Sequence, residues 1–401
     1  MNLHIPLFSL SQIFSNRTFA TLYLVIMCIQ IVPIEGYGIS PLKVALMALA
    51  PLVFILKIPH ISKALLLGAL YWAVCYFSAA FNGDMRFSTI GYLGMFIISF
   101  IVFYNLVYSG AFTITYFFKL IRTLILAFGI ALVLQQVCIL AGIRSFWLIN
   151  LDNQFFLSLT KLPSLTLEPS HTSRILSFLM LAYWRCIEIG NDGNKPTITQ
   201  LFTKEHRWVS ISFLWTMFTM GSGTAFVGIG ILSLYFIERK TIIYIIPLLV
   251  GLFILGQSME LKQMDRTIRV AQAATTGKSK NVIKEDGSAA YRVIPIINTF
   301  KIDLLNKKSW VGNGTMKQNQ IMSLTGGEKI GVVEQFGLFG FFASLILIFS
   351  CVIHKPVSLE SLLFLLLEGF TLGNIYHAWA WMLIFTGVGF FKRQQRKEKS
   401  S

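Results

Sequence analysis

Apolar segments long enough to cross a lipid bilayer recur along almost the whole chain. Each runs for roughly 17 to 23 residues, which lets a helix cross a hydrocarbon core of about 30 Å. Only 13% of the residues are charged and 55% are hydrophobic, whereas charged residues make up about a quarter of a typical soluble domain. One such run can belong to a soluble core, but a long series of them cannot. The sequence therefore predicts an all-α polytopic integral membrane protein, one membrane domain over residues 1–401.

About twelve segments have this character. They are residues 19–34, 41–56, 64–81, 89–107, 120–141, 173–189, 208–220, 225–237, 241–256, 333–353, 359–372 and 376–390. Short loops rich in Lys and Arg favour the cytoplasmic side, and the strongly basic residues 392–401 predict a cytoplasmic tail. Counting back by alternation places both termini inside. The predicted outer loops are residues 35–40, 82–86, 142–172, 221–224, 258–330 and 373–374.

The longest polar interruption is residues 258–330, a large and partly helical outer loop between the ninth and tenth segments. It carries twelve Lys and Arg residues against six Asp and Glu residues. Loops longer than about 60 residues translocate largely regardless of charge, so an outer position is allowed. The excess positive charge would attract a phosphate-bearing substrate, although a merely solvated loop would have the same charge. Arg292, near the start of a predicted helix over 288–306, has the planar fork of donors that suits phosphate.

A second outer segment precedes the sixth apolar run. Pro169 disfavours helix in the residue before it, and Ser170 is predicted to cap the helix that follows. The free N–H groups of that helix end would then point outward, where they can bind a phosphate. Arg174, one turn further on, would lie within the membrane, where an ionised residue has a partner or a ligand. A pair with Glu168, or a side chain reaching to the interface, is the alternative.

Candidate acid–base groups lie on the same side. Glu168 and His171 can both exchange protons, although an interfacial Glu and a His at a polar helix start would serve structure equally well. His377 stands beside Trp379 and Trp381, which is typical of an interfacial aromatic belt.

Other polar breaks are predicted to line the same outward cavity. Ser222 and Thr224 belong to a small-residue turn between two segments, and Glu334 opens the tenth segment. Gly337 and Gly340 follow it and are predicted to be close helix-packing contacts. The five cysteines lack metal-ligand spacing and no nucleotide-binding loop is present, so we expect no metal, no cofactor and no nucleic-acid partner.

Four of these elements, in this order and on one side, resemble the Wzy-type repeat-unit polymerases of O-antigen, capsule and exopolysaccharide, within the O-antigen ligase/polymerase superfamily. The resemblance covers residues 165–341. The elements are Glu168-Pro169-Ser170, Ser222-Gly223-Thr224, Arg292 with Gly312-Asn313-Gly314, and Glu334-Gln335-Phe336-Gly337-Leu338-Phe339-Gly340.

The resemblance implies a glycosyltransferase of the bacterial inner membrane that needs no metal or cofactor and acts on undecaprenyl-pyrophosphate-linked oligosaccharide. A flippase and a chain-length regulator would be its partners beside the lipid bilayer. By this analogy Arg174 and Arg292 bind the pyrophosphate, and Glu168 orients or deprotonates the acceptor, with His171 as a second candidate. The possible cavity-lining residues are Ser222, Thr224, Asn313, Glu334 and His377.

Three other functions remain open from the sequence, one of them a scaffold subunit of an envelope assembly complex, in which substitutions of the arginines would be tolerated. O-antigen ligases share the lipid-linked donor, but they typically carry a functional His in the large outer loop, and residues 258–330 contain none. A transporter or flippase of lipid-linked oligosaccharide would use Arg174 and Glu168 as cavity charges. Transporters often consist of repeated halves, and the sequence shows no such repeat.

Overall fold

The helices of this chain follow the predicted apolar segments closely. The computed structural model describes residues 15–30, 40–58, 61–82, 85–143, 161–237, 301–315, 331–368 and 375–400, and scattered positions between 269 and 300. These residues are helical or irregular, with no strand among them. Each predicted segment overlaps a described helix except residues 241–256, which lie outside the described residues, as do residues 31–34 and 369–372 and most of the loop 258–330.

The N-terminal half contributes the following helices. They are α2 (Asn16–Cys28), α3 (Pro41–Lys57), α4 (Lys63–Phe81), α5 (Phe87–Tyr108), α6 (Ile114–Leu140), α7 (Pro169–Gly190), α8 (Ile198–Leu201), α9 (Arg207–Thr219) and α10 (Gly223–Ser233), which ends in the 3₁₀ turn η3 (Leu234–Phe236).

The C-terminal part adds a short helix within the loop 258–330 and three longer elements. They are α15 (Lys307–Val311), α17 (Gly331–Leu347) with the π-helical turn η4 (Ile348–Val352), α18 (Leu359–Glu368) and α19 (Ile375–Ser400). The basic residues 392–400 continue α19 as helix.

Four of the described helices are long and apolar enough to cross a membrane by length and composition. They are Lys63–Phe81, Phe87–Tyr108, Ile114–Leu140 and Gly331–Val352. Many large apolar side chains on the outer helices are exposed, among them Leu56, Phe77, Phe81 and Ile130. Such a surface suits lipid better than water. Both features are consistent with a helical membrane protein.

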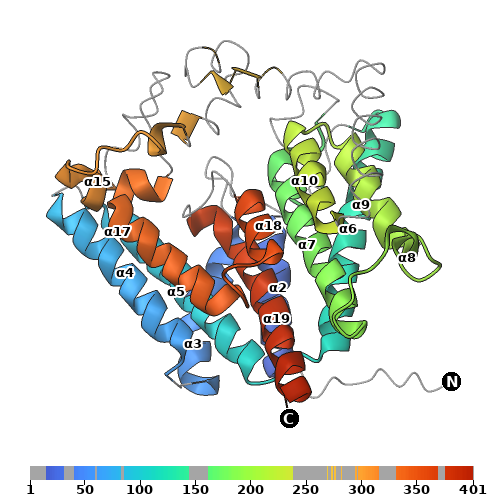
Figure 1. Ribbon diagram of the computed structural model, residues 1–401, viewed down its shortest axis with the longest axis horizontal. Helices are drawn as coiled ribbons and strands as arrows, with labels where there is room; N and C mark the ends of the chain where they lie inside the picture. The colour runs from blue at the N-terminus through green and yellow to red at the C-terminus, as the bar shows by residue number, and fades with distance from the viewer. Residues whose placement is uncertain are drawn as a thin grey trace.

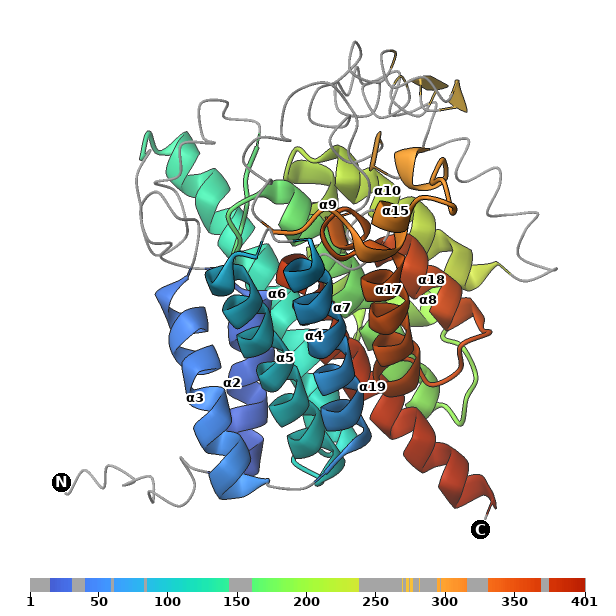
Figure 2. The same ribbon diagram turned by 90° about the vertical axis from the view of Figure 1, so that its left-hand side faces the viewer.

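The longer helices lie side by side, with α5 packed against α2, α3, α4 and α19, and α7 packed against α6, α10 and α19 (Figures 1 and 2). The short helix α15 lies at one end, which we call the upper end, and the C-terminal end of α19 lies at the other, lower end. Gln395 and Lys399 of α19 donate hydrogen bonds to the backbone oxygens of Ile189 and Asp192, just at the end of α7. Because α7 finishes at the lower end, it begins in the upper half of the molecule.

Candidate functional site

The turn before α7 is fixed by an amide side chain buried in α6. Gln135 is completely buried, and its Nε2 donates to the backbone oxygen of Ser164 at 3.0 Å, while Ser164 N donates to Gln135 Oε1 at 2.9 Å. Ser164 Oγ also donates to the backbone oxygen of Phe128. Ser164 has a φ of 54°, a left-handed conformation that is uncommon outside glycine. A buried, strained residue held by its neighbours is a frequent feature of functional sites.

Replacing Gln135 with Leu should destabilise this turn. The change removes both hydrogen bonds and leaves the N–H and C=O of Ser164 buried, and each unsatisfied group costs about 1–3 kcal/mol. We expect the purified protein to have a lower melting temperature in detergent, and the protein in cells to be less active. Gln136→Leu is the control, because Gln136 bonds only half-buried or exposed partners on α9. Equal melting temperatures for both variants would contradict the prediction.

The first turn of α7 gathers the candidate acid–base residues. Glu168, not the predicted Ser170, occupies the N-cap position, and Pro169 is the first helical residue. The prediction of the cap was wrong because proline fits the first helical position, where no N–H is needed. Ser170 Oγ instead donates to Glu168 Oε2 at 3.1 Å, and His171 N donates to the backbone oxygen of Glu168 at 3.0 Å.

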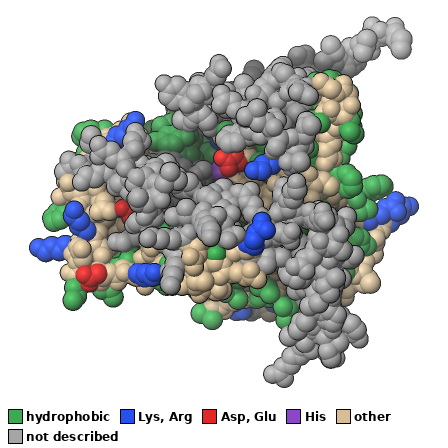
Figure 3. Space-filling view, turned by 90° about the horizontal axis from the view of Figure 1, so that it is seen from above, with side chains coloured by type: hydrophobic (Ala, Val, Ile, Leu, Met, Phe, Trp, Pro, Cys, Tyr) green, Lys and Arg blue, Asp and Glu red, His purple; other side chains and the backbone are tan. Residues whose placement is uncertain are grey.

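Glu168 and His171 are both half-buried, so a substrate can reach their side chains while protein groups surround part of each. Thr166 Oγ1 donates to the Glu168 backbone oxygen at 2.8 Å and lies 2.8 Å from Thr172 Oγ1, which holds this end of the helix in place. Seen from above, the upper face shows a His side chain next to an acidic one, with a basic one close by (Figure 3).

Arg174 is buried one turn into α7, with 7% of its surface exposed. Its charge acts on the carboxyl group of Glu368 at the end of α18, which is only 1% exposed. Trp381 of α19 lies beside Glu368 and stacks on Phe178, with ring centroids 5.1 Å apart. The structure thus identifies Glu368 as a buried carboxyl group near Arg174, which the sequence analysis had not considered.

Sequence reasoning missed Glu368, although a signal was present. It is an acidic residue inside the predicted apolar segment 359–372. An ionisable residue within such a segment is a candidate functional group, so the sequence indicates Glu368 as a candidate in the same way as Arg174.

The turn 312–314 docks onto the start of α17. Asn313 Nδ2 donates to Glu334 Oε1 at 2.5 Å, and the backbone N–H groups of Asn313 and Gly314 donate to the oxygens of Glu334 and Gln335 at 2.8 and 3.1 Å. Two sequence elements of the predicted cavity, about twenty residues apart, therefore form one structural unit. Asn313 and Glu334 bind each other.

Glycine makes this docking possible. Gly337 has a φ of 66° and a conformation that interrupts α17, and a side chain there would overlap the carbonyl group of Trp310. Gly312, with a φ of 76°, faces the same backbone, and its added Cβ would lie 2.6 Å from Gly337 N. Gly337 is a close contact, as predicted, but its neighbour is the turn after α15 rather than a second membrane helix.

The same turn is attached to α4. Ser78 Oγ and Asn82 Nδ2 both donate to the backbone oxygen of Val311, and Arg86 N donates to Thr315 Oγ1 at 2.7 Å. Next to it, α4 and α17 enclose an apolar groove of about 470 Å³. Its lining includes Phe77, Phe81, Val311, Phe339, Phe342 and Ile346.

The remaining predicted residues divide between described and undescribed parts. Ser222 is buried at the N-cap of α10 after Gly221, whose φ is 74°, and Thr224 is half-buried in the first turn. Since α10 packs on α7, both belong to the neighbourhood of α7. Arg292 lies outside the described residues, and His377 lies in α19 with its side chain outside the description. In the described ranges no group of three His, Cys, Asp or Glu side chains is placed to bind a metal.

Comparison with protein-family models, with curated proteins and with solved structures finds no match.

Proposed function

We propose that this chain is a membrane glycosyltransferase of the bacterial inner membrane, a polymerase that joins undecaprenyl-pyrophosphate-linked oligosaccharide units into a surface polysaccharide. The observation that carries the proposal is the start of α7, where buried Arg174 follows half-buried Glu168 and His171 within two helical turns. An anion-binding group beside groups that can take a proton suits transfer of a sugar from a pyrophosphate to a hydroxyl.

The reaction assigns a role to each group. The acceptor hydroxyl oxygen attacks the anomeric carbon of the donor sugar, and the bond from that carbon to the pyrophosphate oxygen breaks with its electron pair. Negative charge grows on the leaving pyrophosphate, which Arg174 and Arg292 would neutralise. Glu168, or His171 in its place, would take the proton of the acceptor hydroxyl.

The apolar groove between α4 and α17 supports a lipid-linked substrate. It lies against Val311, directly beside the turn that bonds to Glu334, and its walls are almost entirely apolar. A polyprenyl chain in this groove would keep its charged head near the upper end of the helices. The groove thus offers a binding surface for the carrier that a soluble glycosyltransferase does not need.

The proposed orientation follows the charge distribution. In it the chain crosses the membrane about twelve times, the lower end with the basic end of α19 is cytoplasmic, and residues 258–330 are periplasmic. The site at the start of α7 would then face the periplasm, where lipid-linked repeat units await polymerisation.

A transporter or flippase of the same lipid-linked anion is the second candidate. The buried ionisable side chains of Arg174 and Glu368 favour it, because ionisable residues inside a membrane bundle often mark a transport pathway. A ligase that transfers the finished glycan to an acceptor lipid is the third, since it would use the same donor chemistry.

The test is the profile of surface polysaccharide and lipid-linked intermediates in cells that lack the protein, separated on gels. We expect loss of long chains, with single repeat units retained on the outer side and rescue by the wild-type chain. Full-length polymer stalled on its carrier would mean a ligase, and repeat units trapped inside would mean a flippase. An unchanged profile would overturn all three.

A further inference from the structure

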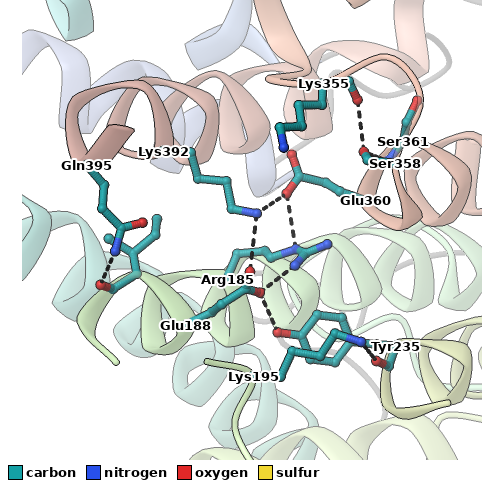
Figure 4. A network of polar contacts seen from close by, with 11 residues as sticks. Arg185, Glu188, Lys195, Tyr235, Lys355, Ser358, Glu360, Ser361, Lys392 and Gln395 are labelled. Atoms are coloured by element: carbon teal, nitrogen blue, oxygen red, sulfur yellow. Dashed lines mark hydrogen bonds and ion pairs between the residues drawn. The ribbon is translucent and has the colours of Figure 1, made fainter. Parts of the chain in front are cut away.

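A charged cavity of about 270 Å³ lies between α7, α18 and α19 at the lower end of the molecule. Its centre is an ion-pair network in which Lys392 Nζ lies 2.8 Å from Glu360 Oε2 and 3.6 Å from Glu188 Oε1, while Arg185 Nε lies 3.1 Å from Glu360 Oε2 (Figure 4). Arg185 also pairs with Glu188. Two cations and two carboxylates therefore balance one another.

The rim of the cavity adds positive charge to this balanced centre. Lys355 and Arg396 line the cavity and are exposed, and neither forms an ion pair among the described residues. The cavity as a whole thus has two positive charges in excess. An exposed pair of cations around a polar hollow attracts an anion of one or two charges.

A histidine on the wall has unused hydrogen-bonding capacity. His354 lines the cavity, and its Nδ1 is buried without a hydrogen-bond partner in the described part of the chain. Burial, and then the positive charges of Arg393 and Arg396, lower the pKa of His354, so its ring is neutral at pH 7. A neutral ring can donate an N–H to an acceptor oxygen.

We infer that this cavity binds a phosphate group, carried either by the head group of an anionic lipid or by a soluble phosphate. Lys355 and Arg396 would supply charge-assisted hydrogen bonds from the rim, and the neutral ring of His354 would line the wall without adding charge. The carboxylates do not repel the ligand because Arg185 and Lys392 already neutralise them. The site lies at the opposite end of α7 from Arg174, so it does not depend on the proposed function.

The ion-pair network gives the cavity a rigid base. Tyr235 donates its hydroxyl to Glu188 Oε2 at 2.8 Å, and the Arg185 guanidinium lies 4.9 Å from the centre of the Tyr235 ring. Lys195 bonds to the backbone oxygen of Tyr235 at 3.1 Å. Because α7, α18, α19 and η3 are all connected here, removal of rim cations leaves the packing of these elements intact.

The test compares the full-length wild type with a Lys355→Gln, Arg396→Gln double variant. Lys204→Gln, Arg207→Gln is the matched control, since both residues are exposed cations that do not line the cavity. In one arm, the proteins are taken from vesicles of phosphatidylcholine with or without phosphatidylglycerol, and retained lipid is counted by native mass spectrometry. In the other arm, inorganic phosphate is titrated into protein in neutral detergent by calorimetry.

We expect the wild type and the control to bind alike and the double variant to bind at least about tenfold more weakly, because two charge-assisted contacts are lost. Selective retention of phosphatidylglycerol identifies a lipid head group, and binding in the phosphate titration identifies a soluble phosphate. The inference is overturned if neither probe binds the wild type, or if the double variant binds as tightly as the control.

Discussion

Replacement of Arg174 by Ala is expected to abolish long polysaccharide chains. The proposed role of Arg174 is to neutralise the leaving pyrophosphate, and no other described cation lies in the first two turns of α7. The change also removes the cation whose charge acts on buried Glu368. Removing a buried cation that faces a buried carboxyl group can lower the stability of the protein, so the amount of protein in the membrane must be measured together with the polymer.

The double variant Arg174→Met, Glu368→Gln separates catalysis from stability. It removes the buried cation together with the buried carboxyl group, so the protein should accumulate in the membrane at nearly the wild-type level. We expect polymer to be absent all the same, on gels of surface polysaccharide from complemented cells. Arg207→Ala, at an exposed arginine, should leave the polymer unchanged. Normal polymer from the double variant would show that Arg174 acts only in folding.

The sequence predicts the helices of this chain well because membrane-length apolar runs have few alternatives. Each described helix of α2 to α7 falls on a predicted segment, and α7 begins where Pro169 requires it. The position of Arg174 one turn into α7 follows from the same local signal. Local sequence preference thus predicts where each helix lies in the chain and at which turn of the helix each side chain stands.

Contacts between distant residues could not be predicted in this way. Gln135 and Ser164 are 29 residues apart, and Arg174 and Glu368 lie on helices separated by most of the C-terminal half. No periodicity links such partners, because the pairing depends on which helix faces pack together. The sequence indicates that the glycines near Asn313 and Glu334 matter for close packing. That they contact each other follows only from the three-dimensional arrangement of the helices.

Replacement of Gly337 by Ala should detach the turn 312–314 from α17. Gly337 has a φ of 66° and a ψ of −168°, a conformation that essentially only glycine adopts and that costs another residue about 1–3 kcal/mol. The added methyl group would also overlap the backbone of Trp310, which cannot move freely because Val311 is bonded to Ser78 and Asn82. We expect a loss of at least about 2 kcal/mol in stability, seen as a lower melting temperature in detergent.

Gly91→Ala is the matched control for this prediction. Gly91 lies in α5, and an added Cβ there has no neighbour within 4 Å. Since Ala favours helix over Gly by up to about 1 kcal/mol, this variant should melt at the wild-type temperature or slightly above it. Equal melting temperatures for the two variants would show that the docking of the turn contributes nothing to the fold.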